Sequence, residues 1–326
     1  MADLSEAAGV VAGVPGDVRY GTTAATAAAP GVSELRDFWK LLKPNVMQLV
    51  IFTSAVALYL APGRLHPLLG FTAMVCIALG AGASAAINNW YDADIDGRMA
   101  RTRLRPTAAG RIEPAEALSV GVTLAIISVM LMGLALNWLA AGLLAGTIGF
   151  YVLVYTMWLK RRTPQNIVIG GAAGALPPVV AWAAATGQVS LLPLLLFAII
   201  FLWTPPHFWA LAVYRSGDYE RVGVPMLPVV AGRRRTLDQI LAYTVVLVAA
   251  SLLPFLLGEA GAVYGVLALG LGGAFVGYAV RLRRTDRDVL AMRTFRYSIF
   301  YLFLLFAALV ADRAARDLLP QLLGWR

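Results

Sequence analysis

Three oxygen-bearing side chains recur every four residues in the stretch NNWYDADIDGRMARTRLRP, residues 88–106. Asn88, Asp92 and Asp96 are separated by steps that each turn only about 40° around a helix, so they share one helix face. Asp94 points the other way. Two carboxylates and an amide oxygen are hard ligands suited to Mg2+, which completes its shell with water and phosphate oxygens. The spacing therefore predicts a magnesium site, although an acidic helix end that faces water and pairs with nearby arginines would have the same pattern.

Basic residues follow this acidic face directly. Arg98, Arg101 and Arg105 come within nine positions of Asp96, and the last two are again four apart. Guanidinium groups beside a metal-binding carboxylate face are typical of a diphosphate site, because the metal bridges some oxygens and the arginines hold the others. Zinc is disfavoured, since the chain has two histidines and one cysteine.

A second polar cluster lies in residues 204–228. Asp218 could supply a further metal ligand, and Tyr214 and Arg215 could contact phosphate, but an ordinary charged loop would have the same composition. The pair Pro205-Pro206 is expected to break or kink the helix within an apolar stretch, which is tolerated chiefly where backbone lines a cavity.

Two further residues each have two interpretations. Lys160 is either a phosphate contact or an anchor at the membrane surface. His207 is either a ligand or a buried imidazole that is hydrogen-bonded to a backbone carbonyl, which is the more usual role of a lone histidine.

The elements that must position these residues are membrane-spanning helices. Hydrophobic residues make up 60% of the 326-residue chain and charged residues 14%, with a mean hydropathy of +0.73, which excludes a soluble globular domain of this size. A spanning helix needs about 20 apolar residues. Nine such runs are predicted, at 45–61, 68–90, 115–135, 138–158, 166–186, 191–212, 237–256, 260–280 and 296–312.

Basic residues alternate between the loops, and this alternation predicts the orientation. All but four of the 27 Lys and Arg fall in the N-terminal segment or in the loops after the second, fourth, sixth and eighth runs. Cytoplasmic loops carry this excess, so the N-terminus is predicted inside the cell and the C-terminus outside. The net charge of +9 thus reflects topology, and no nucleic-acid partner is predicted. The single cysteine, Cys76, lies inside the second run, so no intramolecular disulfide can form.

The chain resembles the UbiA superfamily of membrane prenyltransferases over residues 35–312. The superfamily pattern of an Asn, an Asp four later and an Asp eight later is matched by Asn88, Asp92 and Asp96. Four stretches narrow the resemblance to the branch that farnesylates protoheme IX. They are DGRMARTRLRP, YTMWLKRRTPQNIVIGGAAGALPP, WTPPHFWALA and DYERVGVPMLPVVAG.

The resemblance implies an all-α integral membrane protein, with nine transmembrane helices in a UbiA-type bundle around a central cavity and caps over helices 2 to 3 and 6 to 7. A membrane domain is expected over 35–315 in a cell (inner) membrane. The Ala-, Gly- and Thr-rich composition before it predicts a disordered tail over 1–34, and the basic residues predict that this tail is cytoplasmic and that a short tail over 316–326 is extracytoplasmic. Many members carry a second paired-Asp motif, of which only Asp218 is present here, with Tyr214 four residues earlier.

The implied reaction is the Mg2+-dependent transfer of farnesyl from farnesyl diphosphate to the 2-vinyl group of heme B, giving heme O. Membrane lipid surrounds the protein, and handover of the product to a downstream heme-modifying membrane enzyme is expected because heme is hydrophobic and reactive. A prenyltransferase for a quinone precursor or another aromatic acceptor is the alternative, and a membrane transporter ranks below it. The implied site residues are, for metal and catalysis, Asn88, Asp92, Asp96, Asp218 and Lys160; for diphosphate, Arg98, Arg101, Arg105, Lys160, Tyr214 and Arg215; and for heme, His207.

Overall fold

Helices dominate the part of the chain that the computed structural model describes, which is residues 34–63, 65–100 and 102–322, and no strand occurs there. The predicted tail over 1–34 lies outside these residues except for Glu34, and residues 316–322 of the predicted C-terminal tail continue the last helix. The elements are α1 Leu35–Leu41, α2 Pro44–Leu60, α3 Pro67–Tyr91, α4 Ala93–Asp96, α5 Pro114–Ala135, α6 Trp138–Gly149, the π-helix η1 Phe150–Leu159, α7 Asn166–Ala175, α8 Pro177–Thr186, α9 Leu191–Tyr214, α10 Ser216–Arg221, α11 Leu227–Val230, α12 Arg233–Leu256, α13 Ala262–Thr285 and α14 Asp288–Leu322.

The number of spans agrees with the nine predicted runs. In the described part of the chain, eight helical segments are long and apolar enough to cross a membrane, and α1 with α2 forms a ninth when this pair, bent by 55°, is counted as one span. The prediction of an all-α, multi-pass membrane protein is therefore confirmed.

Residues visible in the sequence set many helix ends. Proline stands in the first turn of α2, α3, α5 and α8, where its missing N–H costs nothing. Gly187 ends α8 with a φ of +69°, a left-handed conformation that glycine adopts without steric cost.

Two interruptions occur within runs that the hydropathy predicts as simple helices, and one expected interruption is absent. The run at 138–158 changes from α-helix to π-helix at Phe150, and the run at 166–186 is divided at Leu176, immediately before Pro177-Pro178. Of the break or kink expected at Pro205-Pro206, the break is absent, since α9 is one helix from Leu191 to Tyr214 with both prolines inside it. Neighbouring helices α7, α12 and α14 pack against α9 and hold it in place despite the missing backbone bonds.

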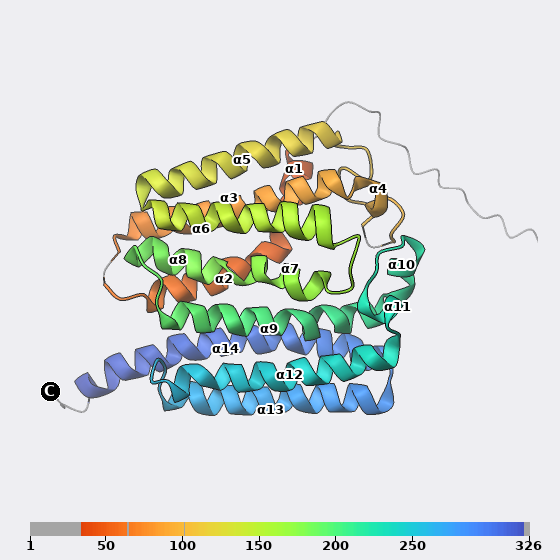
Figure 1. Cartoon of the computed structure of the whole chain (residues 1–326). Coiled ribbons are helices and arrows are strands. Elements are labelled where there is room, and N and C mark those ends of the chain that lie inside the picture. The colour runs from red at the N-terminus through yellow and green to blue at the C-terminus, as the bar shows by residue number, and fades with distance from the viewer. Residues whose placement is uncertain (1–33, 64, 101, 323–326) are drawn as a thin grey trace, which may run out of the picture.

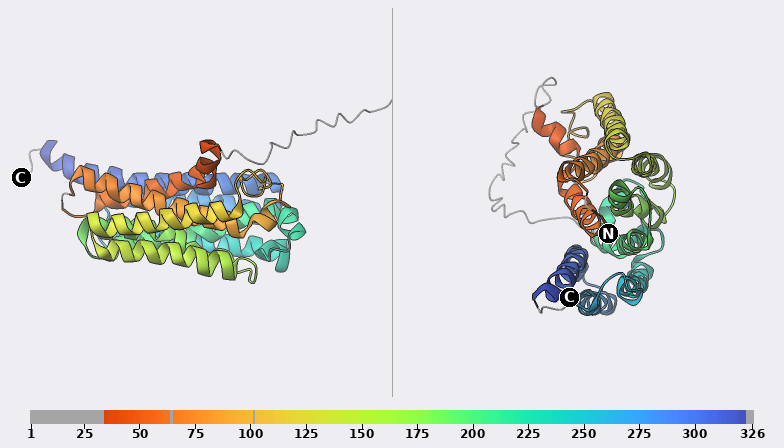
Figure 2. Two further views of the ribbon diagram at one scale, coloured as in Figure 1. Left: turned by 90° about the horizontal axis from the view of Figure 1, so that it is seen from above. Right: turned by 90° about the vertical axis from the view of Figure 1, so that its left-hand side faces the viewer.

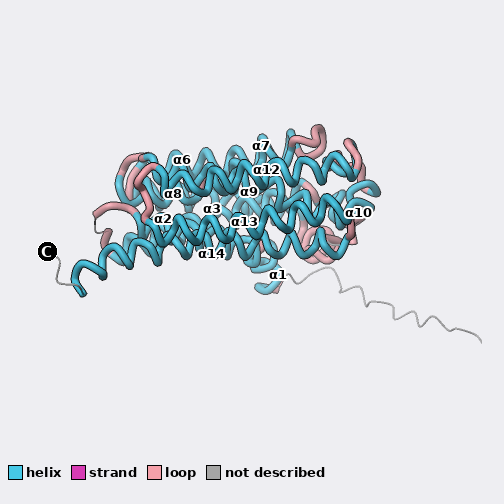
Figure 3. The backbone as a smooth tube through the Cα atoms, turned by 90° about the horizontal axis from the view of Figure 1, so that it is seen from below, coloured by secondary structure: helices cyan, strands magenta, loops and turns pink. Residues whose placement is uncertain are grey.

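The long helices lie side by side and the connecting loops gather at two ends of the bundle (Figures 1 and 3). The end-on view in Figure 2 shows that the helices follow a curved path, and α14 returns to contact α2. Small residues allow close approach. At Gly121 on α5, a Cβ atom would lie 2.6 Å from Ile87 Cγ1 and 3.1 Å from the carbonyl oxygen of Ala83, both on α3.

Short elements cap the end of the bundle where α4, α10 and α11 lie (Figure 1). Ile95 of α4 and Met99 after it form an apolar cluster with Tyr219 of α10 and Met226 before α11. The segment after α3 therefore packs against the segment after α9. This contact brings together the two polar regions that the sequence analysis singled out, over residues 88–106 and 204–228.

Candidate active site

The predicted acidic face is present and buried. Asn88, Asp92 and Asp96 are 3%, 0% and 2% exposed. They do not lie on one continuous helix as predicted, because α3 ends at Tyr91 and Asp92 joins it to α4. Backbone bonds from Asp92 N to Asn88 O (3.0 Å) and from Asp96 N to Asp92 O (2.9 Å) keep the four-residue repeat through this junction. The stripe is therefore a buried site and not an acidic helix end in water.

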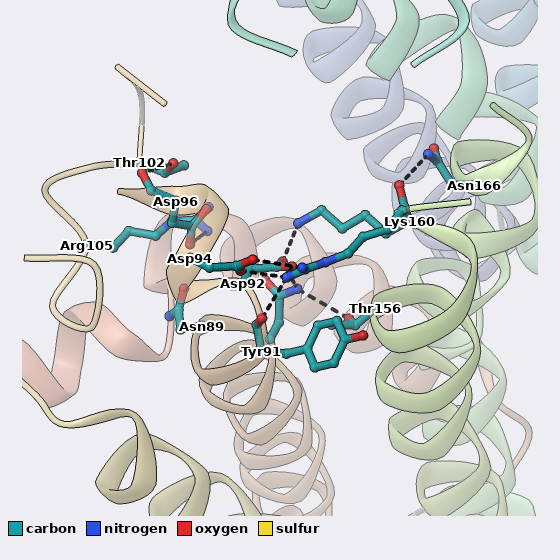
Figure 4. Close-up of polar contacts among 12 residues, drawn as sticks. Asn89, Tyr91, Asp92, Asp94, Asp96, Thr102, Arg105, Thr156, Lys160 and Asn166 are labelled. Atoms are coloured by element: carbon teal, nitrogen blue, oxygen red, sulfur yellow. Dashed lines mark hydrogen bonds and ion pairs between the residues drawn. The ribbon is translucent and has the colours of Figure 1, made fainter. Parts of the chain in front are cut away.

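Each member of the stripe contacts a cationic side chain, and Figure 4 shows Lys160 beside Asp92 and Arg105 beside Asp96. Lys43 Nζ donates to Asn88 Oδ1 at 2.7 Å, Lys160 forms an ion pair with Asp92, and Arg105 Nη1 lies 2.5 Å from Asp96 Oδ2. Asn88 Nδ2 in turn donates to Asp92 Oδ2 at 2.7 Å. Because buried carboxylates need a compensating charge, these cations stabilise the stripe, and they also provide positive charge directly beside it.

Asp94 lies on the other side, as the spacing predicts. Its side chain is 54% exposed and accepts hydrogen bonds from Arg161 at 2.7 and 2.9 Å. These bonds hold the pKa of the Asp94 carboxyl below its usual value. Arg161 also donates to the carbonyl oxygen of Tyr91 at 2.8 Å and stacks over the Tyr91 ring, so it fixes the junction between α3 and α4 from outside.

The three predicted diphosphate arginines are placed differently from one another. Arg105 reaches the stripe, as described above. Arg98 is exposed and donates to the carbonyl oxygen of Asp94 at 3.3 Å. Arg101 lies outside the described residues. Of the two arginines that the structure describes, only Arg105 contacts the stripe.

The second predicted cluster lies on and beside α10. Asp218 is buried between Arg215 and Arg221, at N to O distances of 3.8 and 3.7 Å, and its Oδ2 has no hydrogen-bond partner. Tyr214 is partly exposed, and the Arg215 guanidinium lies 5.3 Å from the centre of its ring. Over the described part of the chain, no three His, Cys, Asp or Glu side chains come together as a metal cluster, so Asp218 is not joined to Asp92 and Asp96 in one group.

The donors at the stripe fit a hard divalent cation. Asn88, Asp92 and Asp96 offer oxygen atoms only, and the unpartnered oxygen of Asp218 is a further buried acceptor. Nitrogen and sulfur donors lie elsewhere. His66 accepts a bond from Leu68 N at the start of α3, and Cys76 is buried within the same helix.

An apolar cavity of about 150 Å³ adjoins the stripe. Lys43, which bonds to Asn88, is one of its lining residues, and Tyr151 of η1 is another. Most of the remaining lining is aliphatic, such as Leu144 and Val180, and comes from α2, α3, α6, α7 and α8. A ligand with a charged head at the stripe could therefore place an apolar tail in this cavity.

His207 is held in one orientation by its surroundings. Its ring stacks on Trp203 and Phe295, with centroids 4.1 and 4.6 Å away, and its Nδ1 lies 2.7 Å from Ser298 Oγ. Ser298 Oγ also donates its single proton to the carbonyl oxygen of Phe295 at 2.6 Å. Donation from Nδ1 to Ser298 Oγ satisfies both contacts, and it leaves Nε2 of the neutral ring with a free lone pair.

Three side chains around the stripe were not predicted from the sequence. Lys43 and Arg161 entered the sequence analysis only as topological charges, and Thr156, which accepts a bond from Asn88 Nδ2 at 3.3 Å, not at all. Lys43 has a weak signal, since it stands directly before a helix-starting proline. Nothing in the run of Lys160, Arg161 and Arg162 shows which side chain turns inward.

Comparisons with known proteins agree with this geometry. The model of the UbiA prenyltransferase family matches residues 49–307. The protoheme IX farnesyltransferase of Parvibaculum lavamentivorans is 58% identical over 294 residues, which are 88% of this chain and 92% of the relative.

Two solved structures share the fold at low identity. A structure of digeranylgeranylglyceryl phosphate synthase has a TM-score of 0.71 at 19% identity, covering 85% of this chain and 98% of that one. A UbiA homolog from Archaeoglobus fulgidus bound to GPP and Mg2+ has a TM-score of 0.59 at 17% identity, covering 84% and 99%. The chain belongs to the UbiA prenyltransferase family.

Proposed function

We propose that this protein transfers a farnesyl group from farnesyl diphosphate to the 2-vinyl group of heme B, giving heme O. The observation that carries the proposal is the position of Lys43, which bonds to the buried oxygen stripe and also lines the apolar cavity. A prenyl diphosphate has a matching form, with an anionic head and an apolar tail. The acceptor is inferred from the relative named protoheme IX farnesyltransferase.

Metal binding is assigned to the oxygen donors. Asn88, Asp92 and Asp96 would hold Mg2+, with Asp218 as a further acidic contact, and the Archaeoglobus fulgidus homolog bound to GPP and Mg2+ supports this choice of ion. When bound, Mg2+ would neutralise charge on the diphosphate oxygens. The metal would take carboxylate oxygens that now pair with Lys160 and Arg105, and would leave these cations free to bind diphosphate.

The cationic side chains stabilise the leaving group. Ionisation breaks the bond between C1 of the farnesyl group and the diphosphate oxygen, so negative charge grows on the diphosphate where fixed cations are most effective. Lys160 and Lys43 lie beside the stripe in the described structure. The diphosphate contacts proposed from the sequence are Arg98, Arg101, Arg105, Lys160, Tyr214 and Arg215, and Lys43 is added to them here.

The cavity protects the farnesyl cation. Water would convert this cation to farnesol, so the site must be dry where the cation forms. The aliphatic lining around Leu144 and Val180 provides an apolar environment. The terminal vinyl carbon of heme then attacks C1, a carbon–carbon bond forms, and water adds to the remaining vinyl carbon and loses a proton.

His207 is proposed as the contact to heme. Its Nε2 lone pair could bind the heme iron, or the ring could contact a propionate, and the stacking on Trp203 and Phe295 would fix its direction. The product is hydrophobic, so we expect direct handover to a downstream heme-modifying enzyme in the same membrane.

The protein is placed in the cell (inner) membrane, with the active-site loops in the cytoplasm. The loops after α4, η1, α9 and α13 lie at one end of the bundle (Figure 1), and together with the helix ends that flank them they carry most of the basic residues. Since basic loops remain cytoplasmic, this arrangement supports a cytoplasmic active site and an extracytoplasmic C-terminus.

The reaction can be tested with purified protein, radiolabelled farnesyl diphosphate, Mg2+ and heme B. The expected product is a farnesylated, hydroxylated heme that is detected by chromatography and mass spectrometry. A parallel reaction with a quinone precursor identifies the alternative acceptor. Labelled quinone without labelled heme would contradict the proposed acceptor, and no transfer to either would favour a transporter.

A further inference from the structure

A second pocket of about 270 Å³ lies on the other side of α9 from His207. It is lined by the start of α7, by α9, by α11 and by α12. It shares no lining residue with the cavity beside the stripe. Trp209 lines it two residues after His207, a rotation of about 200° around the helix. This pocket therefore does not belong to the candidate active site.

Hydrogen-bond donors without partners surround this pocket. Trp209 is 2% exposed, and its Nε1 has no acceptor. The side chains of Gln165, Arg235 and Gln239 and the hydroxyl of Tyr243 line the same pocket, and none of them is hydrogen-bonded or ion-paired within the described structure. No Asp or Glu is among the described residues that line it. A buried indole N–H is normally satisfied, so the pocket is suited to a ligand that offers acceptor oxygens.

Arg235 differs from the two arginines that precede it. Arg233 forms ion pairs with Asp286 and Asp288, and Arg234 Nη1 donates to the carbonyl oxygen of Arg283 at 3.1 Å. Arg233 contacts the turn after α13 and Arg234 the last turn of α13, whereas Arg235 is exposed and lines the pocket without a counter-charge. The Arg235 guanidinium is thus available to an anionic ligand beside the buried, unsatisfied Nε1 of Trp209.

The lining continues into an apolar surface along α12. Arg235, Gln239 and Tyr243 are four residues apart and share one face. Val246 follows three residues later on this face, and its side chain is exposed in a helix that spans the membrane. A ligand at this place meets donors at one end and an apolar surface at the other. A soluble anion would contact only the hydrogen-bond donors and not the apolar surface.

We propose that this pocket binds the phosphate group of an anionic phospholipid, with the acyl chains lying along the exposed face of α12. Basic pockets between membrane helices are a recognised type of lipid headgroup site. Arg235 and Trp209 Nε1 would donate to the phosphate oxygens, and Gln165 and Gln239 to the remaining oxygens of the headgroup. This inference does not depend on the proposed prenyl transfer.

Native mass spectrometry of the full-length protein in neutral detergent tests the proposal, with phosphatidylglycerol and phosphatidylcholine added in turn. We expect the wild type to retain phosphatidylglycerol in preference to phosphatidylcholine. Because a charge-assisted hydrogen bond is lost, Arg235→Ala should weaken phosphatidylglycerol binding about tenfold. Trp209→Phe keeps a ring but removes the donor, and should weaken binding severalfold.

Arg234→Ala is the matched control, since it removes the same charge one residue away and outside the pocket. It should retain the lipid as the wild type does. Equal losses in Arg234→Ala and Arg235→Ala, or no loss in Arg235→Ala, would overturn the proposal. Displacement of the lipid by millimolar inorganic phosphate would show a site for free oxyanions and would overturn the assignment to a lipid.

Discussion

At the scale of single residues, the two aspartates of the stripe differ from the aspartate between them. Asp92 and Asp96 are buried and contact Lys160 and Arg105, whereas Asp94 is half exposed and held by Arg161. Alternation of this kind is expected where residues two apart point to opposite sides of a helical turn. The proposed chemistry therefore assigns metal binding to Asp92 and Asp96 but not to Asp94, although all three are aspartates within five positions.

Substitution of Asp92 or Asp96 by Asn is expected to lower farnesyl transfer by a factor of about 1,000, since the groups that position charge at the leaving diphosphate are lost. The rate at saturating Mg2+ with labelled farnesyl diphosphate measures this effect. Asp94→Asn is the matched control and should stay within a few fold of the parental rate. A parental rate in a correctly inserted Asp92→Asn protein would exclude the proposed metal site.

Ser298 sets the tautomer of His207, so its removal should change how His207 meets heme. In Ser298→Ala, Nδ1 loses its acceptor at 2.7 Å, and the proton is free to move to Nε2. The expected result is a shifted Soret band of the heme complex, together with restoration of the parental spectrum in Ser298→Thr, which keeps a hydroxyl. Identical spectra for all three proteins would remove His207 from the proposed heme contacts.

At the scale of elements, two departures from regular helix place the site. Lys43 takes a left-handed φ of 55° between α1 and α2, where the axis bends by 55°. Asp92 separates α3 from α4. Non-glycine residues rarely adopt positive φ, and such strain is concentrated at functional sites. The bend at Lys43 is what brings its ammonium group to Asn88.

The packing of α3, which carries the stripe, depends on Gly121 of α5. A methyl group there would lie 2.6 Å from Ile87 Cγ1, so Gly121→Ala should separate the helices and lower stability by about 1–3 kcal/mol. Thermal unfolding in detergent measures the difference. Gly142→Ala adds the same methyl group to α6 in open space and should leave the midpoint unchanged or slightly raised. Equal midpoints for the two variants would contradict the close packing.

At the scale of the whole molecule, the bundle has chemically different ends. The end with α4, α10 and α11 holds the stripe and most basic loops, and α14 extends beyond the bundle at the other end (Figure 1). The positively charged loops favour one orientation of the protein in the membrane, in which the stripe lies at the cytoplasmic face.

Reporter fusions at the C-terminus test this orientation. Alkaline phosphatase, which folds only outside the cytoplasm, should be active there, and green fluorescent protein exported in an unfolded state should be dark. The same pair fused to the N-terminus should give the opposite result. A fluorescent C-terminal fusion with inactive phosphatase would reverse the predicted topology.

Local patterns in the sequence were sufficient to predict the membrane-spanning helices and the spacing of the stripe. Apolar runs predict spanning helices because a membrane leaves few other ways to satisfy the backbone. The four-residue spacing of Asn88, Asp92 and Asp96 predicts that they share one face because this spacing matches the helical repeat. Prolines at helix starts also act only on their immediate neighbours in the sequence. The family motif of one Asn and two Asp lies within nine consecutive residues.

Long-range packing decided which residues from distant parts of the chain contact one another. Lys43 meets Asn88 across 45 residues, and Lys160 meets Asp92 across 68, so no local spacing could predict either pair. Pro205-Pro206 left α9 unbroken because helices from distant parts of the chain hold it. The cavity, the tautomer of His207 and the donor-lined pocket at Trp209 also arise where separate helices meet. The sequence thus determined which helices form and which oxygen-bearing side chains make up the stripe, because those depend on near neighbours. Only the tertiary structure decided which charges meet, because those contacts depend on the three-dimensional packing of the helices.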